Sequence, residues 1–513
     1  MKKIIIAILC LTVVVTAILA TGKLRPDSNT TDMAEASTEP FEEEARDVYL
    51  PYFKGKAINP FKSNSPTNLA IATLLYDSLF VMNRDWSSTG LIATEYTNDG
   101  KQVTVKLVDG AVFSNGASLT AYDVVYSFNL AKKSTAFKGR LSNFAGATAG
   151  ADTVTFTLTQ PDIYAQQCLT FPIVQNGTGT AALPIGSGRY IFRSINGKYV
   201  LSANPTSTRG ETLNTSTIGL TPITAENDEI YRIQTGELSY YCNDMDTGSY
   251  TKITAQTVSV PTNNLVYLGY NSSVKSLSDK AVITAIRYAI DKNTLADTVF
   301  DNFCTLTDTP FNPKWYALKD IQLPSYEYNL IKAGNILDEN GYNYSPKEKN
   351  SFRYDSDGHF EVKIIVNKES AIKVACAKYI ATSLKNLGLK VTLSSLTFDD
   401  YRKALTEGNY DFYIGEVKIS PNMDLSCFFK KGGGASYGIS SNTISNAYND
   451  FKSGSIDLKT FISVFEVEKP FIPLCYRTSV AYYSNEVTYE GTVNEYDPYK
   501  NIYSWETSKM IIN

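Results

Sequence analysis

A strand, a helix and a second strand follow one another between residues 361 and 393. Residues 361–367 alternate apolar and polar side chains, as a strand does, and residues 389–393 alternate in the same way. Between them, apolar side chains recur every three or four residues until Gly388, a helix-ending residue. Two strands joined through a helix form a right-handed crossover in a parallel sheet, so the sequence predicts an α/β fold. The apolar stripe of the helix is Ala377, Ile380, Leu384 and Leu387.

The length of the chain requires further domains. It has 513 residues, and a single hydrophobic core stops growing well before that size, so we expect two or three domains. The composition is that of a globular protein, with 43% hydrophobic residues, 19% charged residues and a net charge of −4. Proteins that bind nucleic acid concentrate Lys and Arg, so we expect no nucleic-acid partner.

The N-terminus predicts export. Lys2 and Lys3 precede an apolar run from Ile4 to Ala20, the pattern of a signal peptide or of a short membrane anchor. Cleavage after Ala20 and retention as an anchor both fit this run. Residues 21–47 are rich in Ser, Thr, Asp, Glu and Pro and cannot bury a core, so they predict a disordered tether. We therefore expect an extracytoplasmic protein at the cell surface.

Two further segments predict local structure. Residues 102–108 alternate strictly, which indicates a strand of an antiparallel sheet with one wet face, and Thr120 and Asp123 have the spacing of a capping box. Residues 265–271 are β-branched, aromatic or aliphatic with one Gly, which predicts another strand. Asp279 then offers its carboxylate to the first amides of a helix. We expect the chain to cross from one region to another near this strand.

The sequence offers little for catalysis or metal binding. His359 is the only histidine and lies in a polar turn, so a catalytic triad or a His-rich metal site has one candidate in an unpromising place. The cysteines beyond the leader form no C-x-x-C pair, and we expect mostly free, buried thiols. We predict no enzymatic activity, no cofactor and no metal site. These cysteines are Cys168, Cys242, Cys304, Cys376, Cys427 and Cys475.

Several segments in the right order resemble one family of proteins. Residues 106–128, KLVDGAVFSNGASLTAYDVVYSF, resemble the motif L-R-x-G-V-x-F-x-D-G-x-P-L-T-A-x-D-V-x-x-S of the family 5 solute-binding proteins. Residues 184–190, PIGSGRY, resemble the family's P-x-G-T-G-P-Y loop, and residues 470–476 resemble A-P-x-[IV]-P-L-Y. The paired glycines of PIGSGRY fit either a sharp turn between domains or amides presented to an anion. Members of the family are extracytoplasmic receptors of oligopeptide, dipeptide and nickel importers.

The resemblance implies a two-lobed α/β fold. It is the periplasmic-binding-protein-like fold, type II and cluster C-like, with an additional inserted domain, and the chain crosses between lobes near Tyr270 and again near Arg477. Residues 1–20 are then the signal peptide or anchor and 21–47 the tether. The expected lobe 1 comprises 48–70, 185–268 and 480–513, the inserted α+β domain 71–184, and lobe 2 269–479.

The function that the resemblance implies is that of a receptor. We expect a monomeric protein that captures a peptide or similar small solute by hinged closure and delivers it to an ABC permease in the membrane. Two alternatives stay open at this point. One is a surface adhesion or sensor protein that kept the receptor fold, and the other is an exported hydrolase.

The segment after residue 411 departs from the family's pattern. Peptide-binding members usually carry a Trp here and, a few residues on, an Asp that pairs with the peptide α-amino group, but this chain reads IGEVKISPNMD over 414–424. Glu416 or Asp424 is the expected substitute, because a carboxylate in a desolvated cleft binds an ammonium through charge-assisted hydrogen bonds. By the resemblance, Tyr476 lies near the ligand. The expected ligand-binding residues are Tyr270, Asn271, Glu416, Lys418, Asp424 and Tyr476.

Overall fold

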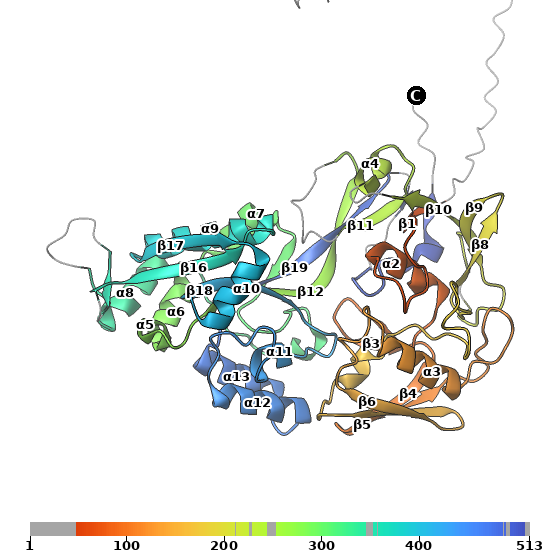
Figure 1. Cartoon of the computed structure of the whole chain (residues 1–513), viewed down its shortest axis with the longest axis horizontal. Helices are drawn as coiled ribbons and strands as arrows, with labels where there is room; N and C mark the ends of the chain where they lie inside the picture. The colour runs from red at the N-terminus through yellow and green to blue at the C-terminus, as the bar shows by residue number, and fades with distance from the viewer. Residues whose placement is uncertain are drawn as a thin grey trace, which may run out of the picture. The chain divides into compact units, whose positions relative to one another are not determined.

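The structure, a computed structural model, describes residues 48–210, 212–224, 228–243, 253–344, 352–355, 358–485, 487–488 and 493–507 (Figure 1). The expected leader and tether, residues 1–47, lie outside the described residues. None of the described helices has both the length and the apolar character that crossing a membrane requires.

A seven-stranded sheet, which we call the central sheet, contains the predicted strand–helix–strand unit. β16 and β17 pair in parallel, from Glu361 opposite Lys390 to Asn367 opposite Leu396, and α9 joins them along the chain. This confirms the predicted parallel pairing. β18 adds a parallel neighbour on the other side of β16. The strands are, across the sheet, β11 (Tyr240–Asn243), β19 (Ile472–Tyr483), β12 (Gln256–Tyr270), β18 (Phe412–Lys418), β16 (Glu361–Asn367) and β17 (Lys390–Leu396), with β13 (Cys304–Leu306) also paired to β19.

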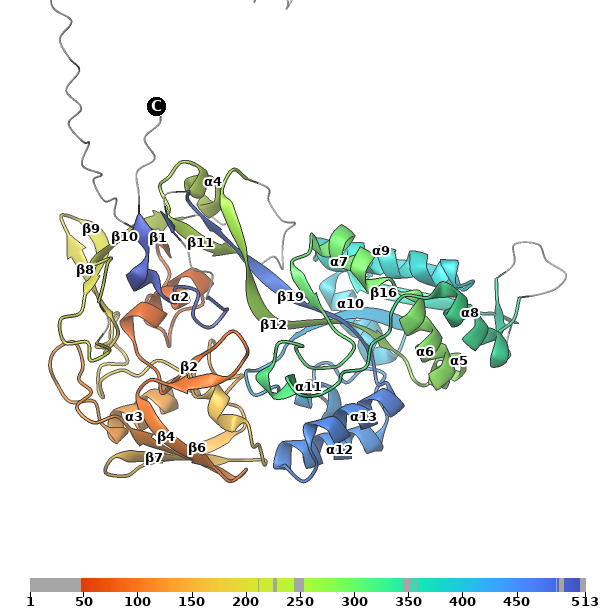
Figure 2. The ribbon, with the colours of Figure 1, turned by 180° about the vertical axis from the view of Figure 1, so that it is seen from behind.

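Helices cover both faces of the central sheet (Figures 1 and 2). Along β12, Leu268 points into one hydrophobic core and Tyr267 into the other, because successive side chains of a strand face opposite ways. The first core also takes the apolar residues of four helices: α6 (Lys280–Ala289), α7 (Lys292–Phe300), α8 (Leu330–Glu339) and α9 (Ala371–Asn386). The second takes those of α10 (Phe398–Glu407), α11 (Ser426–Phe429), α12 (Asn442–Ser453) and α13 (Leu458–Glu468).

A four-stranded N-terminal sheet packs on helix α2 (Pro66–Leu75). The helix begins where the Ser65 side chain accepts a hydrogen bond from the amide of Asn68, with Pro66 in the first turn. Gly188, in the PIGSGRY loop, lies against the other end of this helix, because a Cβ there would lie 2.4 Å from the carbonyl oxygen of Leu74. Close packing thus requires this glycine. The strands are, in sheet order, β1 (Val48–Phe53), β10 (Thr217–Ile223), β9 (Lys198–Ala203) and β8 (Tyr190–Ile195).

An antiparallel insert sheet and helix α3 (Ala121–Ala131) enclose a separate core. Val103 and Val105 of β5 are fully buried while Gln102 is exposed, as the alternating pattern predicted. The capping box at Thr120 and Asp123 is present, since the Asp123 carboxylate accepts from the Thr120 amide at 2.8 Å. The strands are, in sheet order, β4 (Ala93–Asn98), β5 (Gln102–Leu107), β7 (Thr153–Leu158) and β6 (Phe144–Ala149).

Short elements complete the described chain. They are β2 (Phe80–Met82), β3 (Ser88–Gly90), α4 (Asp228–Gln234), α5 (Lys275–Ser278), β14 (Tyr354–Asp355), β15 (Gly358–His359), β20 (Val487–Thr488), β21 (Glu506–Thr507) and three 3-10 turns, η1 (Ala165–Cys168), η2 (Tyr316–Leu318) and η3 (Ile502–Ser504).

Two long strands, β12 and β19, connect the cores. β12 has 15 residues and β19 has 12, and the two pair antiparallel along most of their length. Val260 of β12 lies in the core of the N-terminal sheet, whereas Leu268 lies in a core of the central sheet. Between these points the register breaks, so that residues 261–263 of β12 lie opposite Thr478 alone. This is a bulge at the point where the strands pass from one core to the other.

Candidate functional site

Lys452 is the residue around which the candidate site is built. Its side chain is only 7% exposed, and a buried ammonium requires close compensation. Lys452 Nζ lies 2.6 Å from Asp162 Oδ1 and donates to the carbonyl oxygen of Asn422 at 2.9 Å. The Asn422 amide in turn donates to Asp162 Oδ2 at 2.6 Å. Asp162 follows the insert sheet, whereas Lys452 and Asn422 flank the central sheet, so the pair joins two separately built regions.

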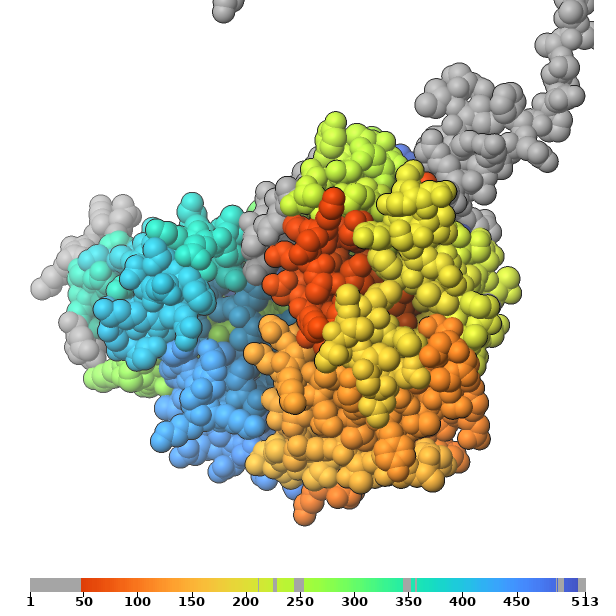
Figure 3. Space-filling model, turned by 45° about the vertical axis from the view of Figure 1, so that its right-hand side comes forward, coloured from red at the N-terminus to blue at the C-terminus, as the bar shows by residue number. Residues whose placement is uncertain are grey.

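Aromatic and backbone contacts continue this junction. The ring of Tyr164 meets that of Trp315 edge-on, with centroids 5.0 Å apart. The Gln167 side-chain amide donates to the Tyr316 hydroxyl at 3.0 Å, and the Tyr316 backbone amide donates to the Asp85 carbonyl at 2.8 Å. We call this surface the seam: Asp85 and residues 162–167 on one side, and residues 315–316, Asn422 and Lys452 on the other. Figure 3 shows the insert (orange) against α12 and α13 (blue).

Of the expected ligand-binding residues, Asp424 lies beside the seam. Its Oδ1 accepts hydrogen bonds from the Tyr448 hydroxyl at 2.5 Å and from the Ser426 amide at 2.8 Å. Burial alone disfavours the charged form, but the Lys452 ammonium and these hydrogen bonds outweigh it, so the pKa of Asp424 lies below its ordinary value. Asp424 is therefore a half-buried carboxylate whose oxygens already serve internal donors.

Glu416 is held between two cations. Its Oε1 accepts from Arg477 Nε at 2.9 Å, and its Oε2 lies 3.0 Å from Lys373 Nζ. Arg477 follows Tyr476 on β19, at the bulge, and both side chains are buried. The Tyr476 hydroxyl donates to the Pro310 carbonyl at 2.7 Å. Glu416 thus offers an ion-paired carboxylate close to the strand crossing.

The other three expected residues are placed differently. Lys418 is exposed and pairs with Glu495, Nζ to Oε2, at 2.5 Å. Tyr270 is buried, and its hydroxyl donates to the carbonyl of Lys469. The Asn271 side chain donates to the Gly408 carbonyl at 3.2 Å.

The structure brings some of these residues together and separates others. Glu416 and Lys418 lie two apart on β18, and Tyr476 is on the opposite face, because Val417 and Leu265 share its register. Tyr270 pairs with Phe412, at the far end of that strand. From Phe412 to Lys418 is six residues along β18, and at about 3.3 Å per residue this puts Tyr270 roughly 20 Å from Lys418. Tyr270 and Asn271 are thus remote from Lys418 and from the bulge.

Sequence reasoning missed Asp162, Lys452 and the seam as a whole. Lys452 did carry a signal, because it follows Phe451 on the apolar stripe of an amphipathic helix, where a lysine requires a buried partner. Asp162 carried none, since it lies in a segment without periodicity. Its partner Asn422 is 260 positions away.

The described residues show no arrangement for metal binding. Among them, no group of three or more His, Cys, Asp and Glu side chains converges on a common point. His359 is exposed on β15, with its ring centroid 4.5 Å from that of Tyr354. The six cysteines beyond the leader are free thiols. Burial raises the pKa of Cys168 and Cys376 to about 12, so neither is a reactive thiolate near neutral pH.

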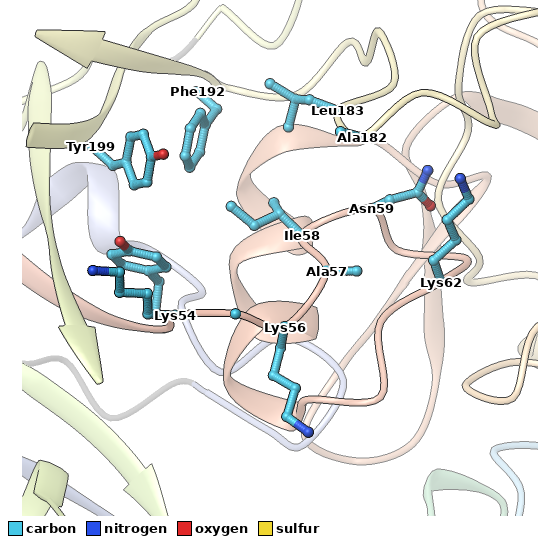
Figure 4. Close-up of a pocket in the computed structure, with 12 residues that line it drawn as sticks. Lys54, Lys56, Ala57, Ile58, Asn59, Lys62, Ala182, Leu183, Phe192 and Tyr199 are labelled. Atoms are coloured by element: carbon cyan, nitrogen blue, oxygen red, sulfur yellow. The ribbon is translucent and has the colours of Figure 1, made fainter. Parts of the chain in front are cut away.

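A cavity of about 530 Å³ lies elsewhere, on the N-terminal sheet (Figure 4). It is formed by the end of β1, the segment that leads into α2, residues 182–183 and the β8–β9 hairpin. None of its lining residues belongs to the seam or to the expected ligand-binding residues.

Two separately packed regions joined by paired long strands, with an α/β sheet in one of them, are the architecture of the solute-binding proteins. The family model "Bacterial extracellular solute-binding proteins, family 5 Middle" matches residues 87–434, and the chain belongs to this family. A solved structure described as a nickel ABC transporter from Bacillus halodurans superposes with a TM-score of 0.73 at 16% identity, covering 90% of this chain and all of that one. The expected two-lobed, type II α/β fold is confirmed.

Two relatives show how far the sequence similarity extends. The oligopeptide-binding protein AppA of Bacillus subtilis is 26% identical over 341 residues, which are 61% of this chain and 62% of AppA. The glutathione-binding protein GsiB of Pectobacterium atrosepticum is 24% identical over 307 residues, which are 56% of this chain and 59% of GsiB. The alignments thus span about three fifths of the length of these relatives.

Proposed function

We propose that this protein is an extracytoplasmic substrate-binding receptor of an ABC importer and performs no catalysis. The observation that carries the proposal is the pair β12 and β19, which pass together from the core of the N-terminal sheet to the cores of the central sheet. A fold in which separately packed regions are joined by paired strand crossings is suited to hinge closure on a ligand. Membership of the family supports this function.

In this proposal the bulge in β12 is the hinge. Residues 261–263 leave the regular ladder, so a rotation here breaks few strand hydrogen bonds. Closure brings Asp162 against Lys452 and Asn422, and the bound solute adds contacts to both lobes. The solute shifts the equilibrium toward closure by its differential affinity for the two states. The proposed lobes follow the boundaries expected from the sequence except at two places: all of α2 (Pro66–Leu75) goes to the N-terminal lobe, on whose sheet it packs, and β12 crosses between the lobes at residues 261–263.

We propose a peptide or a similar small solute as the ligand. The relatives named above are described as oligopeptide-binding and glutathione-binding, which supports this class. Glu416 and Asp424 are the carboxylates proposed for the ligand's ammonium group, and Lys418 is the proposed further contact near the crossing. Tyr476 keeps a ligand-binding role only as the sequence-based proposal, because it is buried on the face of the sheet opposite to Glu416. Tyr270 and Asn271 keep this role only as the sequence-based proposal, because the structure puts them at the far end of β12.

The proposed partner is a permease in the membrane. Residues 1–20, as a signal peptide or anchor, and the tether 21–47 then hold a monomeric receptor outside the cytoplasm. A receptor of this kind meets its ligand in solution and delivers it by docking in the closed state.

The function is tested by identifying what the protein carries. Freshly purified protein is examined by native mass spectrometry and then denatured, and the released small molecules are analysed. We expect a mass excess that disappears on denaturation, together with a released peptide or peptide-like solute. That solute, added back, must bind stoichiometrically without being converted. Conversion of the solute into a product contradicts the receptor function and favours the exported hydrolase.

The carboxylate proposal is tested with the same solute by isothermal titration calorimetry. Glu416→Gln or Asp424→Asn should weaken its binding at least tenfold, because each removes a charge that pairs with an ammonium group. Glu361→Gln is the matched control, since its carboxylate pairs with Lys390 on the exposed edge of the central sheet. Unchanged affinity in both site variants refutes the roles of Glu416 and Asp424, while the receptor function stands on the released solute.

A further inference from the structure

The cavity on the N-terminal sheet has an aromatic wall. The rings of Phe192 and Tyr199 lie 5.1 Å apart, and the Tyr52 ring meets Tyr199 edge-on at 5.4 Å. Figure 4 shows Phe192 and Tyr199 at one end of the cavity, Ile58 near its middle and Lys62 at the other end. Tyr199 remains 40% exposed, although its ring is large and mostly apolar. A flat ring entering the cavity would cover this surface.

The rim of the cavity is cationic. Lys54, Lys56 and Lys62 line it, and no Asp or Glu is among the lining residues. Within the described chain, Lys54 and Lys56 form no ion pair with a carboxylate, while Lys62 Nζ donates to the Thr180 carbonyl at 2.6 Å. Among the described residues, these three ammonium groups have no carboxylate at ion-pair distance. They favour a negatively charged occupant.

The cavity is independent of the proposed hinge. Its lining comes from the end of β1 and the segment after it, from residues 182–183, and from the β8–β9 hairpin. No lining residue belongs to the central sheet or to the seam. A ligand here therefore touches one lobe only, so its binding requires no closure. The volume of the cavity, about 530 Å³, lies within the range of about 300–1,000 Å³ that is typical of small-molecule sites.

We propose that this cavity is a second binding site, which takes a small planar anion such as an aromatic carboxylate or sulfonate. The ring of the ligand packs on Tyr199 and Phe192, and its anionic group receives charge-assisted hydrogen bonds from Lys54 and Lys56. The site goes beyond solute capture between the lobes and does not depend on it.

The probe for the test is 8-anilinonaphthalene-1-sulfonate, whose fluorescence rises in an apolar site. N-phenyl-1-naphthylamine has the same rings without the sulfonate and serves as the neutral comparison. We expect saturable binding of the sulfonate that is at least tenfold tighter than that of the neutral probe. This difference in affinity between the two probes should shrink as the salt concentration rises from 20 to 500 mM. The distance over which exposed charges interact falls from about 30 Å at 0.01 M salt to about 3 Å at 1 M.

Variants then locate the probe. The double change Lys54→Gln/Lys56→Gln should weaken binding of the sulfonate at least fivefold and leave binding of the neutral probe unchanged. Tyr199→Ala should weaken the binding of both probes. Tyr199→Phe keeps the aromatic ring and should bind both probes as the natural protein does. Lys368→Gln, which removes an exposed ammonium on the other lobe, is the control and should change neither. Far-ultraviolet circular dichroism verifies that each variant is folded.

The outcomes separate the site from general surface adsorption. Loss of sulfonate binding in the lysine and Tyr199→Ala variants, with normal binding in Lys368→Gln, establishes the site. Equal binding of both probes, or sulfonate binding that survives both the lysine change and Tyr199→Ala, overturns the proposal. Neither result bears on the released solute, so this inference and the proposed receptor function fail or stand separately.

Discussion

Lys452 shows at the scale of one residue how the seam is stabilised. An ammonium taken out of water is unfavourable by several kcal/mol, and the Asp162 carboxylate and the Asn422 carbonyl offset that penalty. Such a pair adds little net stability compared with apolar side chains of the same shape. Removing one partner is different, because it leaves the other charge buried without compensation.

The first prediction follows from this asymmetry. Lys452→Met should lower the free energy of unfolding by about 3–5 kcal/mol, because the Asp162 carboxylate loses its cation, unless the seam opens and hydrates it. Urea unfolding monitored by circular dichroism measures the loss, and small-angle scattering detects an opened seam as a larger radius of gyration.

The control for Lys452→Met is Lys403→Met. Lys403 lies 3.9 Å from Glu407 on the same helix, and its side chain is 71% exposed, so its loss should change stability by less than about 0.5 kcal/mol. The double variant Lys452→Met/Asp162→Leu should regain most of the lost stability. Normal stability together with a normal radius of gyration in Lys452→Met contradicts the account of the seam.

The second prediction concerns acid. The pKa of Asp424 is lowered in the folded protein, so its contribution to stability is fully present above the unfolded value of about 3.9 and is lost as the pH falls through the folded value. The free energy of unfolding should therefore fall between about pH 5 and pH 2 more steeply in the natural protein than in Asp424→Asn. Urea titrations across this range measure both slopes, and parallel curves refute the role of Asp424 in acid sensitivity.

At the scale of elements, local patterns were sufficient for the strand–helix–strand unit and for the capped helix α3. Their side-chain periodicity and capping residues lie within a few positions of one another. The first half of β12 was missed, because Pro261 and polar residues interrupt its strand pattern. The structure explains this, since Pro261 lies in the bulge, where a missing backbone N–H is tolerated.

The site was less predictable than the fold. The resemblance placed Tyr476 near the ligand, and Glu416 was expected to replace an Asp that the family usually carries. In the structure both residues lie beside the bulge, Tyr476 next to Arg477 on β19 and Glu416 as the partner of Arg477. The pairing of Asp162 with Asn422 and Lys452 depends on how the insert meets α12. That contact depends on tertiary packing, and no sequence period encodes it.

The third prediction addresses the bulge in β12. The buried Asn263 amide donates to the Ile419 carbonyl at 3.1 Å, and the Ile419 amide donates to the Asn263 carbonyl at 2.8 Å. Asn263→Ala leaves a buried carbonyl without its donor and should lower stability by about 1–3 kcal/mol. It should also speed amide hydrogen exchange in residues 419–424, which hydrogen-exchange mass spectrometry measures.

Asn340→Ala is the matched control for Asn263→Ala. The Asn340 side chain also donates to a backbone carbonyl, that of Ile336 at 2.8 Å, but in an exposed position. Water replaces that donor, so Asn340→Ala should change the free energy of unfolding by no more than about 0.5 kcal/mol. Equal effects of the two substitutions would contradict a special role for the bulge.

In the whole molecule, the N-terminal sheet and the central sheet are joined by two strands, β12 and β19, and we propose that the seam forms when the lobes close. In the proposed hinged receptor, the buried pair at Lys452 and the aromatic contacts of Tyr164 stabilise the closed form, and the bulge at 261–263 allows it to open. A ligand contributes by its contacts with both lobes. The lobes are therefore expected to change their separation as one rigid-body motion about the crossing.

The most direct test of this claim is an interlobe distance distribution from double electron–electron resonance. Spin labels are attached through p-acetylphenylalanine at Tyr122 of α3 and Val467 of α13, side chains that are 67% and 68% exposed, which avoids the native cysteines. Protein as purified, protein stripped of ligand by unfolding and refolding, and the Lys452→Met variant are compared. We expect one short distance in the first sample and an added longer population in the other two. A single, identical distance in all three samples would contradict a hinged clamp.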